Sequence, residues 1–206
     1  MANLKGNIAF IAGCAGNVGD GVVRSFLKAG ATVITTSRKQ EKIEELRGCL
    51  GDLANDNFVP IVSDLGDLES AENLRNQLLG LINRLDSVVA TIGGTFLPVL
   101  TVNKGSSYTF LGGSASENVI PNYSLVAIPA AGQLMMAKVL MEEMKDSGVR
   151  INEVMVNSLV NTRATEDNAK PEWITADEIG DYVAWLTSDE AYMVSSSVPY
   201  LQEQTR

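Results

Sequence analysis

Few side chains in this 206-residue sequence could do acid–base chemistry at neutral pH. Tyr123 stands directly before a long apolar segment, in the run NYSLVAIPAAG, where it could serve as a general acid or base. An unassisted tyrosine has a pKa of about 10 and is a poor base at neutral pH. The sequence has no histidine, and its two cysteines, Cys14 and Cys49, form no CxxC pair. Histidine-based catalysis and histidine zinc sites are therefore excluded, and no metal site is predicted.

A glycine-rich segment follows the first predicted strand and opens the first predicted helix. Gly13, Gly16 and Gly19 form the pattern GxxGxxG, with Asn17 and Val18 inside it. Glycine suits such a turn because a side chain would clash with a pyrophosphate, which the N–H groups at the helix start attract. The pattern, in this strand–turn–helix context, predicts a dinucleotide-binding site. The alternative is a turn with a purely structural role.

The second predicted strand ends in polar and basic residues. Sites for NAD usually place an acidic residue here, about 20 residues past the glycines, where it binds the ribose 2′-hydroxyl. This sequence has Ser37, Arg38 and Lys39 instead, and a hydroxyl followed by two cations suits a 2′-phosphate. We therefore expect NADP(H) to be preferred over NAD(H). The alternative is a solvated basic start of the next helix.

The hydrophobic pattern predicts an alternation of strands and helices that would position these residues. Runs such as NIAFIA and SVVATI are apolar throughout, as expected of parallel strands covered by helices on both faces. The predicted strands span residues 7–12, 32–36, 58–63, 87–92, 107–111 and 151–158, and the predicted helices span residues 18–29, 40–50, 68–83, 124–145 and 175–186. This order predicts an α/β fold, a single-domain doubly wound parallel sheet of the Rossmann type over residues 1–206.

The composition is that of a globular domain with an acidic surplus. Sixteen basic and twenty-five acidic residues give a formal net charge of −9, which disfavours nucleic acid and anionic membrane surfaces as partners. No uninterrupted apolar run approaches 18 residues, and the start MANLKGNIAF lacks the apolar core of a secretory signal. We expect a cytoplasmic protein without a membrane partner.

Several motifs, in this order, resemble the short-chain dehydrogenase/reductase family over nearly the whole chain. Besides the glycine turn, they are SDL after the third strand, RINEV after the long helix, and WLTSDEA near the C-terminus. The resemblance implies an NAD(P)-dependent oxidoreductase, with Asp64 and Leu65 beside the adenine and Gly93 of ATIGG beside the nicotinamide ribose. It also implies that Thr162 contacts the nicotinamide amide. Asp64 could instead cap the next helix.

The same resemblance assigns catalytic residues and reveals a departure from the family pattern. The family uses a tyrosine, a lysine four residues later that lowers the tyrosine pKa, and a serine that orients the substrate carbonyl. Tyr123 matches the tyrosine, because Gly132 follows it by nine residues, but Ala127 replaces the lysine. Ser114 is the best match for the serine, and Ser116 is the alternative.

Two functions are compatible with these residues. The first is NADP(H)-dependent hydride transfer to or from an unknown carbonyl or alcohol substrate, in an atypical active site. The second is nucleotide binding without turnover, in a sensor or an interaction subunit, with Tyr123 only lining the pocket. We favour the enzyme. Arg163 could meet an acidic substrate or a phosphate, or form a surface ion pair.

The connection between the fourth and fifth strands is short for a parallel crossover. Only TFLPVLTVNKGS lies between them, whereas such a crossover takes a dozen or more residues and normally includes a helix. Either the crossover is truncated or a segment is missing near residues 94–96, and we favour the second explanation.

The long apolar helix predicted over residues 124–145 has more apolar surface than one sheet face needs. Ile128, Ala131, Met135 and Val139 follow one another on a stripe of this helix. By resemblance to the family, the face away from the sheet would form the contact of a homodimer or homotetramer. The alternative is a helix that packs only on its own sheet.

Overall fold

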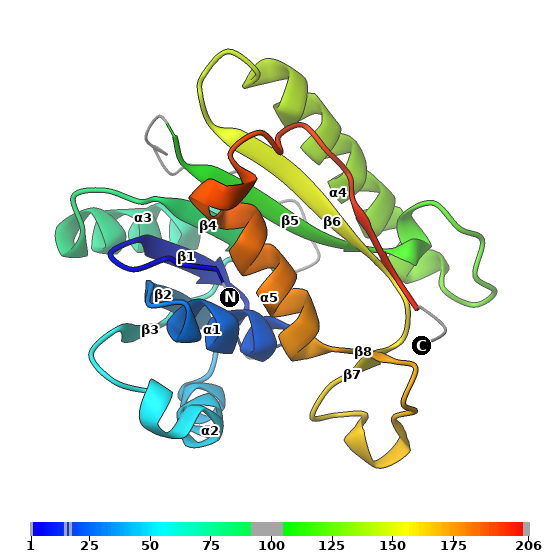
Figure 1. Ribbon diagram of the computed structural model, residues 1–206, viewed down its shortest axis with the longest axis horizontal. Helices are drawn as coiled ribbons and strands as arrows, with labels where there is room; N and C mark the ends of the chain where they lie inside the picture. Colours follow the sequence, from blue (N-terminus) through cyan, green and yellow to red (C-terminus); the bar gives the residue numbers. More distant parts are fainter. Residues whose placement is uncertain (1, 15, 17, 92–104, 204–206) are drawn as a thin grey trace.

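The computed structural model describes residues 2–14, 16, 18–91 and 105–203. Within these ranges, seven strands form one parallel sheet in the order β3-β2-β1-β4-β5-β6-β9 (Figure 1). The chain runs outward from β1 to β3 and then returns to β4 beside β1, so that the direction of winding reverses between β1 and β4. The strands are β1 Ile8–Ala12, β2 Thr32–Ser37, β3 Phe58–Val62, β4 Ser87–Ala90, β5 Ser107–Gly113, β6 Arg150–Asn157 and β9 Tyr200–Gln202.

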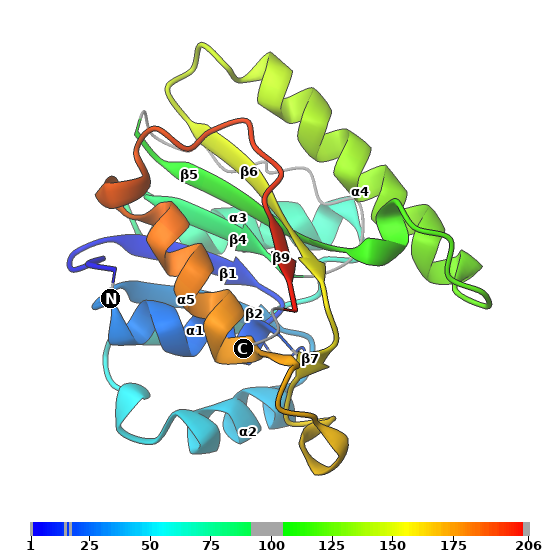
Figure 2. The same cartoon turned by 45° about the vertical axis from the view of Figure 1, so that its right-hand side comes forward.

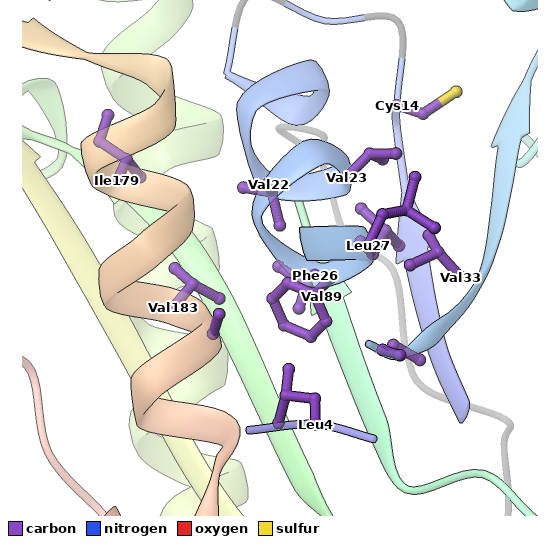
Figure 3. Packing of buried hydrophobic residues seen from close by; sticks show 14 of the residues in the cluster. Leu4, Cys14, Val22, Val23, Phe26, Leu27, Val33, Val89, Ile179 and Val183 are labelled. Carbon is purple, nitrogen blue, oxygen red and sulfur yellow. The ribbon is translucent and has the colours of Figure 1, made fainter. Parts of the chain in front are cut away.

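Helices cover both faces of this sheet. On one face, Phe26 of α1 and Val183 of α5 belong to a single apolar cluster with Val89 of β4 (Figure 3). On the other face, Leu78 of α3 and Met141 of α4 belong to a second cluster that includes Phe10 of β1 and Phe110 of β5. Burial on both faces explains why the strand sequences are apolar throughout. The helices are α1 Gly19–Lys28, α2 Gln40–Leu50, α3 Leu68–Leu81, α4 Ser124–Glu143 and α5 Ala176–Thr187.

This architecture confirms the predicted α/β fold, a single-domain doubly wound parallel sheet. Every predicted helix and strand is present, and each end lies within two residues of the predicted one. The sequence pattern missed β9 and a small parallel pair formed by β7 Val160–Asn161 and β8 Ile174–Thr175. Elements of two or three residues are too short to show a hydrophobic period. The predicted missing segment near 94–96 lies outside the described residues and stays a prediction.

Helix α4 differs from the other helices because much of its apolar surface faces solvent. Figure 2 shows its N-terminal half extending away from the sheet, and Leu125 and Ile128 there are 86% and 73% exposed. Its buried residues, which include Leu134 and Met141, begin at the middle of the helix, with Gln133. By length and composition α4 is apolar enough to cross a membrane, and 22% of its apolar window is buried. A helix that packs against another protein surface meets the same criterion.

Candidate functional site

Backbone hydrogen bonds join the carboxyl ends of β3, β2, β1 and β4 into one edge of the sheet. The amide of Ser63, after β3, donates to the carbonyl of Ser37 in β2 at 3.0 Å. The amide of Cys14, after β1, donates to the carbonyl of Thr36 in β2 at 3.3 Å, and the amide of Thr91, after β4, donates to the carbonyl of Ala12 in β1 at 3.1 Å. The winding reverses at β1 and β4. In doubly wound sheets, this reversal point at the carboxyl edge is where ligands bind.

The glycine turn after β1 has no room for side chains on its inner side. Gly13 has a φ of 92°, a conformation that favours glycine. The amide of Gly16 donates to the carbonyl of Gly13 at 3.2 Å. A Cβ at Gly19 would overlap that same carbonyl and lie 3.1 Å from the Cα of Cys14. Gly13 and Gly19 therefore pack backbone against backbone at this turn, as in the glycine turns that bind a dinucleotide phosphate. The predicted residue Asn17 lies outside the described part of the chain.

Helix α1 presents its N-terminus at this turn. Val18 occupies the N-cap position and, in the described structure, makes no side-chain cap. Free amides and the positive end of the helix dipole favour an anion at such a terminus. Thr91 supports the turn, since its Oγ1 lies 2.8 Å from the carbonyl oxygen of Ala12 and 2.9 Å from that of Gly13. We had not predicted Thr91 as a site residue, although its place at the end of the strand beside β1 was a usable signal.

The predicted 2′-phosphate residues lie at the exposed end of β2. Ser37 is partly buried and its Oγ accepts from the amide of Lys39 at 3.4 Å. Arg38 is exposed and makes no ion pair with any residue that the structure describes. Lys39 is the N-cap residue of α2. A hydroxyl and a free guanidinium therefore stand at one corner of the glycine-turn edge.

Asp64 follows β3 and organises a turn rather than capping the next helix. Its Oδ1 accepts from the amide of Gly66 at 3.0 Å. The cap of α3 is Asp67, whose Oδ1 accepts from the amide of Ser70 at 2.8 Å. The capping alternative for Asp64 was therefore wrong, because the helix begins three residues later than that role would need. Leu65 is partly buried against the α3–α4 core.

Ser114 and Tyr123 belong to elements that pack together, but their side chains are not hydrogen-bonded to each other. Ser114 begins a short helical turn, Ser114–Ser116, that contacts α4. In that turn, Ser116 Oγ donates to the carbonyl of Gly113 at 2.8 Å. Tyr123 is the N-cap residue of α4 and is 51% exposed. The loop before α4 thus leaves about half of Tyr123 exposed to solvent.

Helix α4 offers no lysine near Tyr123. Ala127 lies one turn into the helix and is partly buried. Lys138 follows Tyr123 by fifteen residues on the same helix, which places it about 22 Å farther along the axis. Its ammonium group is too far from the tyrosine hydroxyl to interact with it through water. Along α4, Lys138 is the basic residue nearest to Tyr123.

Thr162 lies in a turn between β7 and β8 and is buried. Its amide donates to Thr165 Oγ1 at 2.9 Å, and Thr165 Oγ1 lies 2.9 Å from the carbonyl oxygen of Val160. The adjacent Arg163 points to α1, where its Nε lies 2.7 Å from Oδ2 of Asp20. Arg163 is exposed, so the alternative of an ion pair at the surface is confirmed, although the partner is buried because the Asp20 side chain is 5% exposed. The predicted residue Gly93 lies outside the described chain.

A buried carboxyl group, which we had not predicted, lies below the Ser114 turn. Glu153 of β6 is fully buried, and its Oε1 accepts from Gln133 Nε2 at 3.3 Å. Its Oε2 has no partner among the described residues. A Cβ on Gly112 would lie 2.5 Å from Glu153 Oε1, so glycine leaves space for the carboxyl. Burial raises the pKa of Glu153 above its usual range.

Comparisons with known proteins agree with this geometry. A family model for short chain dehydrogenases matches residues 7–108. An "Oxidoreductase asL5" of Sarocladium schorii is 24% identical over 238 residues, an alignment that covers 96% of this chain and 95% of that protein.

Solved structures show the same fold. A short-chain dehydrogenase/reductase of Serratia marcescens has a TM-score of 0.80 at 18% identity and covers 96% of this chain and 97% of its own. A short chain dehydrogenase of Bacillus anthracis has a TM-score of 0.80 at 19% identity and covers 97% and 96%. The reversal point at β1 and β4, the glycine turn and the matched family model together identify the chain as a member of the short-chain dehydrogenase/reductase family, whose members bind NAD(P).

Proposed function

We propose that this protein is an NADP(H)-dependent oxidoreductase that transfers hydride to or from a carbonyl or alcohol substrate. The observation that carries the proposal is the glycine turn, where a Cβ on Gly19 would overlap the Gly13 carbonyl. Such a turn before an uncapped helix N-terminus fits the pyrophosphate of a dinucleotide. The nicotinamide, when bound, supplies or accepts the hydride.

The chain's own residues divide between the two ends of the dinucleotide. The pyrophosphate would lie on the amides of the glycine turn, and the adenine would lie beside the β3 end. The nicotinamide half would lie near Thr162 and the β4 end. The residues proposed for the cofactor are Gly13, Gly16, Asn17, Val18, Gly19, Ser37, Arg38, Lys39, Asp64, Leu65, Gly93 and Thr162.

The preference for NADP(H) rests on Arg38. This residue is exposed at the end of β2, has no ion-pair partner in the described structure, and follows the Ser37 hydroxyl. A guanidinium can hold a phosphate through two parallel hydrogen bonds, whereas the 2′-hydroxyl of NAD(H) gains little from it. The Arg38 side chain would therefore discriminate between the two nucleotides.

Cofactor fluorescence titrations of NADPH and NADH test this preference. We expect the wild-type protein to bind NADPH more tightly. We also expect Arg38→Ala to weaken NADPH binding by about tenfold, because a charge-assisted contact is lost, while NADH binding is unchanged. Lys42→Ala is the matched control, since Lys42 lies on α2 and pairs with Glu45. Equal affinity for the two nucleotides, or tighter NADH binding, would contradict the preference.

Ser114 and Tyr123 are the proposed catalytic residues. The Ser114 hydroxyl would orient the substrate oxygen, and the Tyr123 hydroxyl would give or take the proton at that oxygen. Ala127 weakens the acid–base role, because no cation stabilises the tyrosinate at this point of α4. This absence, with the half-exposed Tyr123, favours the second candidate function, a nucleotide-binding protein without turnover that acts as a sensor or an interaction subunit.

Ala127→Lys separates the two candidates. Placing an ammonium group one helical turn from Tyr123 should raise NADPH-dependent reduction of simple aldehydes and ketones by at least about tenfold, since positioned acid–base groups contribute that much or more. Ala131→Lys adds the same charge at an exposed position one turn farther on and should have no effect. Unchanged turnover in Ala127→Lys, with NADPH binding retained, would instead support the function without turnover.

We further propose that the protein forms a homodimer or homotetramer through α4. The N-terminal half of this helix exposes large apolar side chains, and small residues beside them allow a second helix to approach closely. Gly132, for example, has no atom within 4 Å of an added Cβ. Burying this face against its own copy would remove apolar area from water and hold the loop before Tyr123 in place.

A further inference from the structure

The turn that carries Thr162 is stiffened from within. At its base, Val160 pairs with Ile174 and Asn161 pairs with Thr175. Inside the turn, Thr165 Oγ1 lies within hydrogen-bonding distance of the Thr162 amide at 2.9 Å and of the Val160 carbonyl at 2.9 Å. Residues 160–165 therefore form one hydrogen-bonded turn, and a contact that holds Arg163 also constrains its neighbour Thr162.

This turn and the start of α5 are attached to α1 by separate ion pairs. On α1, Asp20 and Arg24 stand one helical turn apart. Asp20 pairs with Arg163 of the turn, and Arg24 pairs with Asp177 at the start of α5. Lys28 of α1 also pairs with Asp177, at 3.4 Å. Helix α1 thus presents an acid to the turn and two cations to the start of α5, which favours one way of docking the segment after β6 onto α1.

The Asp20–Arg163 pair is the stronger anchor because its acid is buried. Asp20 is 3% exposed, and Arg163 is the only cation paired with it among the described residues. A buried carboxylate without its cation is strongly unfavourable, so the pair persists. The Arg163 guanidinium also donates to Cys49 Sγ on α2 at 3.3 Å, which links the turn to a second helix.

Asp20 lies in the first turn of α1, directly after Gly19 of the glycine turn. We propose that Arg163 is a positioning residue, whose ion pair with Asp20 holds Thr162 against the nicotinamide end of the cofactor site. This inference rests on the proposed binding of NADP(H). The inference adds to that proposal a residue that controls cofactor affinity without contacting the nucleotide. The control lies in a contact between α1 and the segment after β6.

A double-mutant cycle with two ligands tests the inference. NADPH is compared with adenosine 2′,5′-bisphosphate, which has no nicotinamide. We expect Asp20→Asn and Arg163→Met each to weaken NADPH binding by about tenfold, and the double variant to be no weaker than either single variant, since both changes break one contact. Asp20→Asn leaves no buried unpaired charge, because the Arg163 side chain is exposed, so it should change binding of the bisphosphate by less than about twofold.

Arg24→Met is the matched control, because it breaks the neighbouring α1–α5 ion pair without releasing Thr162. It should leave the affinity for both ligands unchanged. Hydrogen exchange of residues 158–173 should be faster in Asp20→Asn and Arg163→Met, and unchanged in Arg24→Met.

Each contrary result has a separate meaning. Full NADPH affinity in Arg163→Met overturns the positioning role alone. Equal weakening of both ligands by Asp20→Asn also overturns it, since the pair would then act on the phosphates. A wild-type protein that binds neither ligand overturns the proposed function, and the positioning role with it.

Discussion

Glu153 is an acidic residue whose side chain is fully buried in the core. Its carboxyl is buried between β5, β6 and α4, accepts one hydrogen bond from Gln133 and leaves Oε2 unpaired among the described residues. Burial raises its pKa; the Gln133 contact and the field of Lys138 on α4 oppose this, and Glu117 after the Ser114 turn adds to it. A buried glutamate of raised pKa favours the neutral form, in which the carboxyl could also donate a proton.

Glu153→Gln should change how the free energy of unfolding depends on pH. A raised folded-state pKa stabilises the protein fully below the unfolded pKa of about 4.3, and the contribution is lost as pH rises through the folded-state pKa. The amide cannot ionise, so the variant should be about 1–3 kcal/mol more stable than wild type at pH 8, with a smaller difference at pH 5. Urea unfolding at both pH values measures this.

Glu143→Gln, at the exposed end of α4, is the control for Glu153→Gln and should shift stability little at either pH. An identical wild-type-to-variant difference at pH 5 and pH 8 would mean that Glu153 does not titrate in this range.

Helices α1 and α5 depend on glycine where they touch. A Cβ on Gly21 would overlap the carbonyl of Ala176, and a Cβ on Gly180 would lie 2.5 Å from the carbonyl oxygen of Gly21 and 2.7 Å from Ser25 Oγ. The two helices lie side by side over the sheet in Figures 1 and 2. Helix α5 begins at this contact, with a capping box between Thr175 and Glu178.

Gly180→Ala should therefore destabilise the protein although alanine favours helices. We expect a loss of about 1–3 kcal/mol of unfolding free energy, because the added methyl group must push the backbones of α1 and α5 apart. Gly48→Ala on α2 is the matched control. Its Cβ meets no atom within 4 Å, so it should stabilise the protein by up to about 1 kcal/mol. Equal effects in a thermal or urea unfolding series would contradict the packing argument.

At the scale of the whole molecule, the exposed α4 is the feature that an isolated protomer leaves unexplained. Leu125, Val126, Ile128 and Met135 are all more than half exposed on this one helix. Large apolar patches of this kind mark interaction surfaces in proteins. A second copy is the occupant that the proposed assembly supplies, and its contact should approach the roughly 800 Å² per partner of a stable interface.

Light scattering after size-exclusion chromatography should find a dimer or tetramer of the wild-type protein. Leu125→Glu should give monomers, since a charge buried in an apolar contact has no partner there. Leu79→Glu changes another exposed leucine, on α3, and should leave the assembly intact. A monomeric wild-type protein, or an assembly that persists in Leu125→Glu, would exclude α4 as the contact.

Local patterns were enough to predict the fold class, the order of the elements and the position of the glycine turn. The hydrophobic periods of strands and helices repeat within a few residues. Glycines at a strand–helix junction can be recognised from the residues next to them in the sequence. The polar and basic group at the end of β2 was located in the same way, because Ser37, Arg38 and Lys39 are adjacent in the chain. Whether these residues bind NADP(H) stays a prediction, as do the roles of Ser114 and Tyr123.

Other features depend on residues that are far apart in the chain, so only the folded protein decided them. Nothing near Arg163 indicates that its partner is a buried aspartate of α1, and nothing near Glu153 indicates that Gly112 and Gln133 enclose it. Strand β9 is three residues long and acquires its structure by pairing with β6. These contacts form only when the sheet brings its strands together, because the energy of burial and ion pairing depends on tertiary distance and not on separation in the sequence.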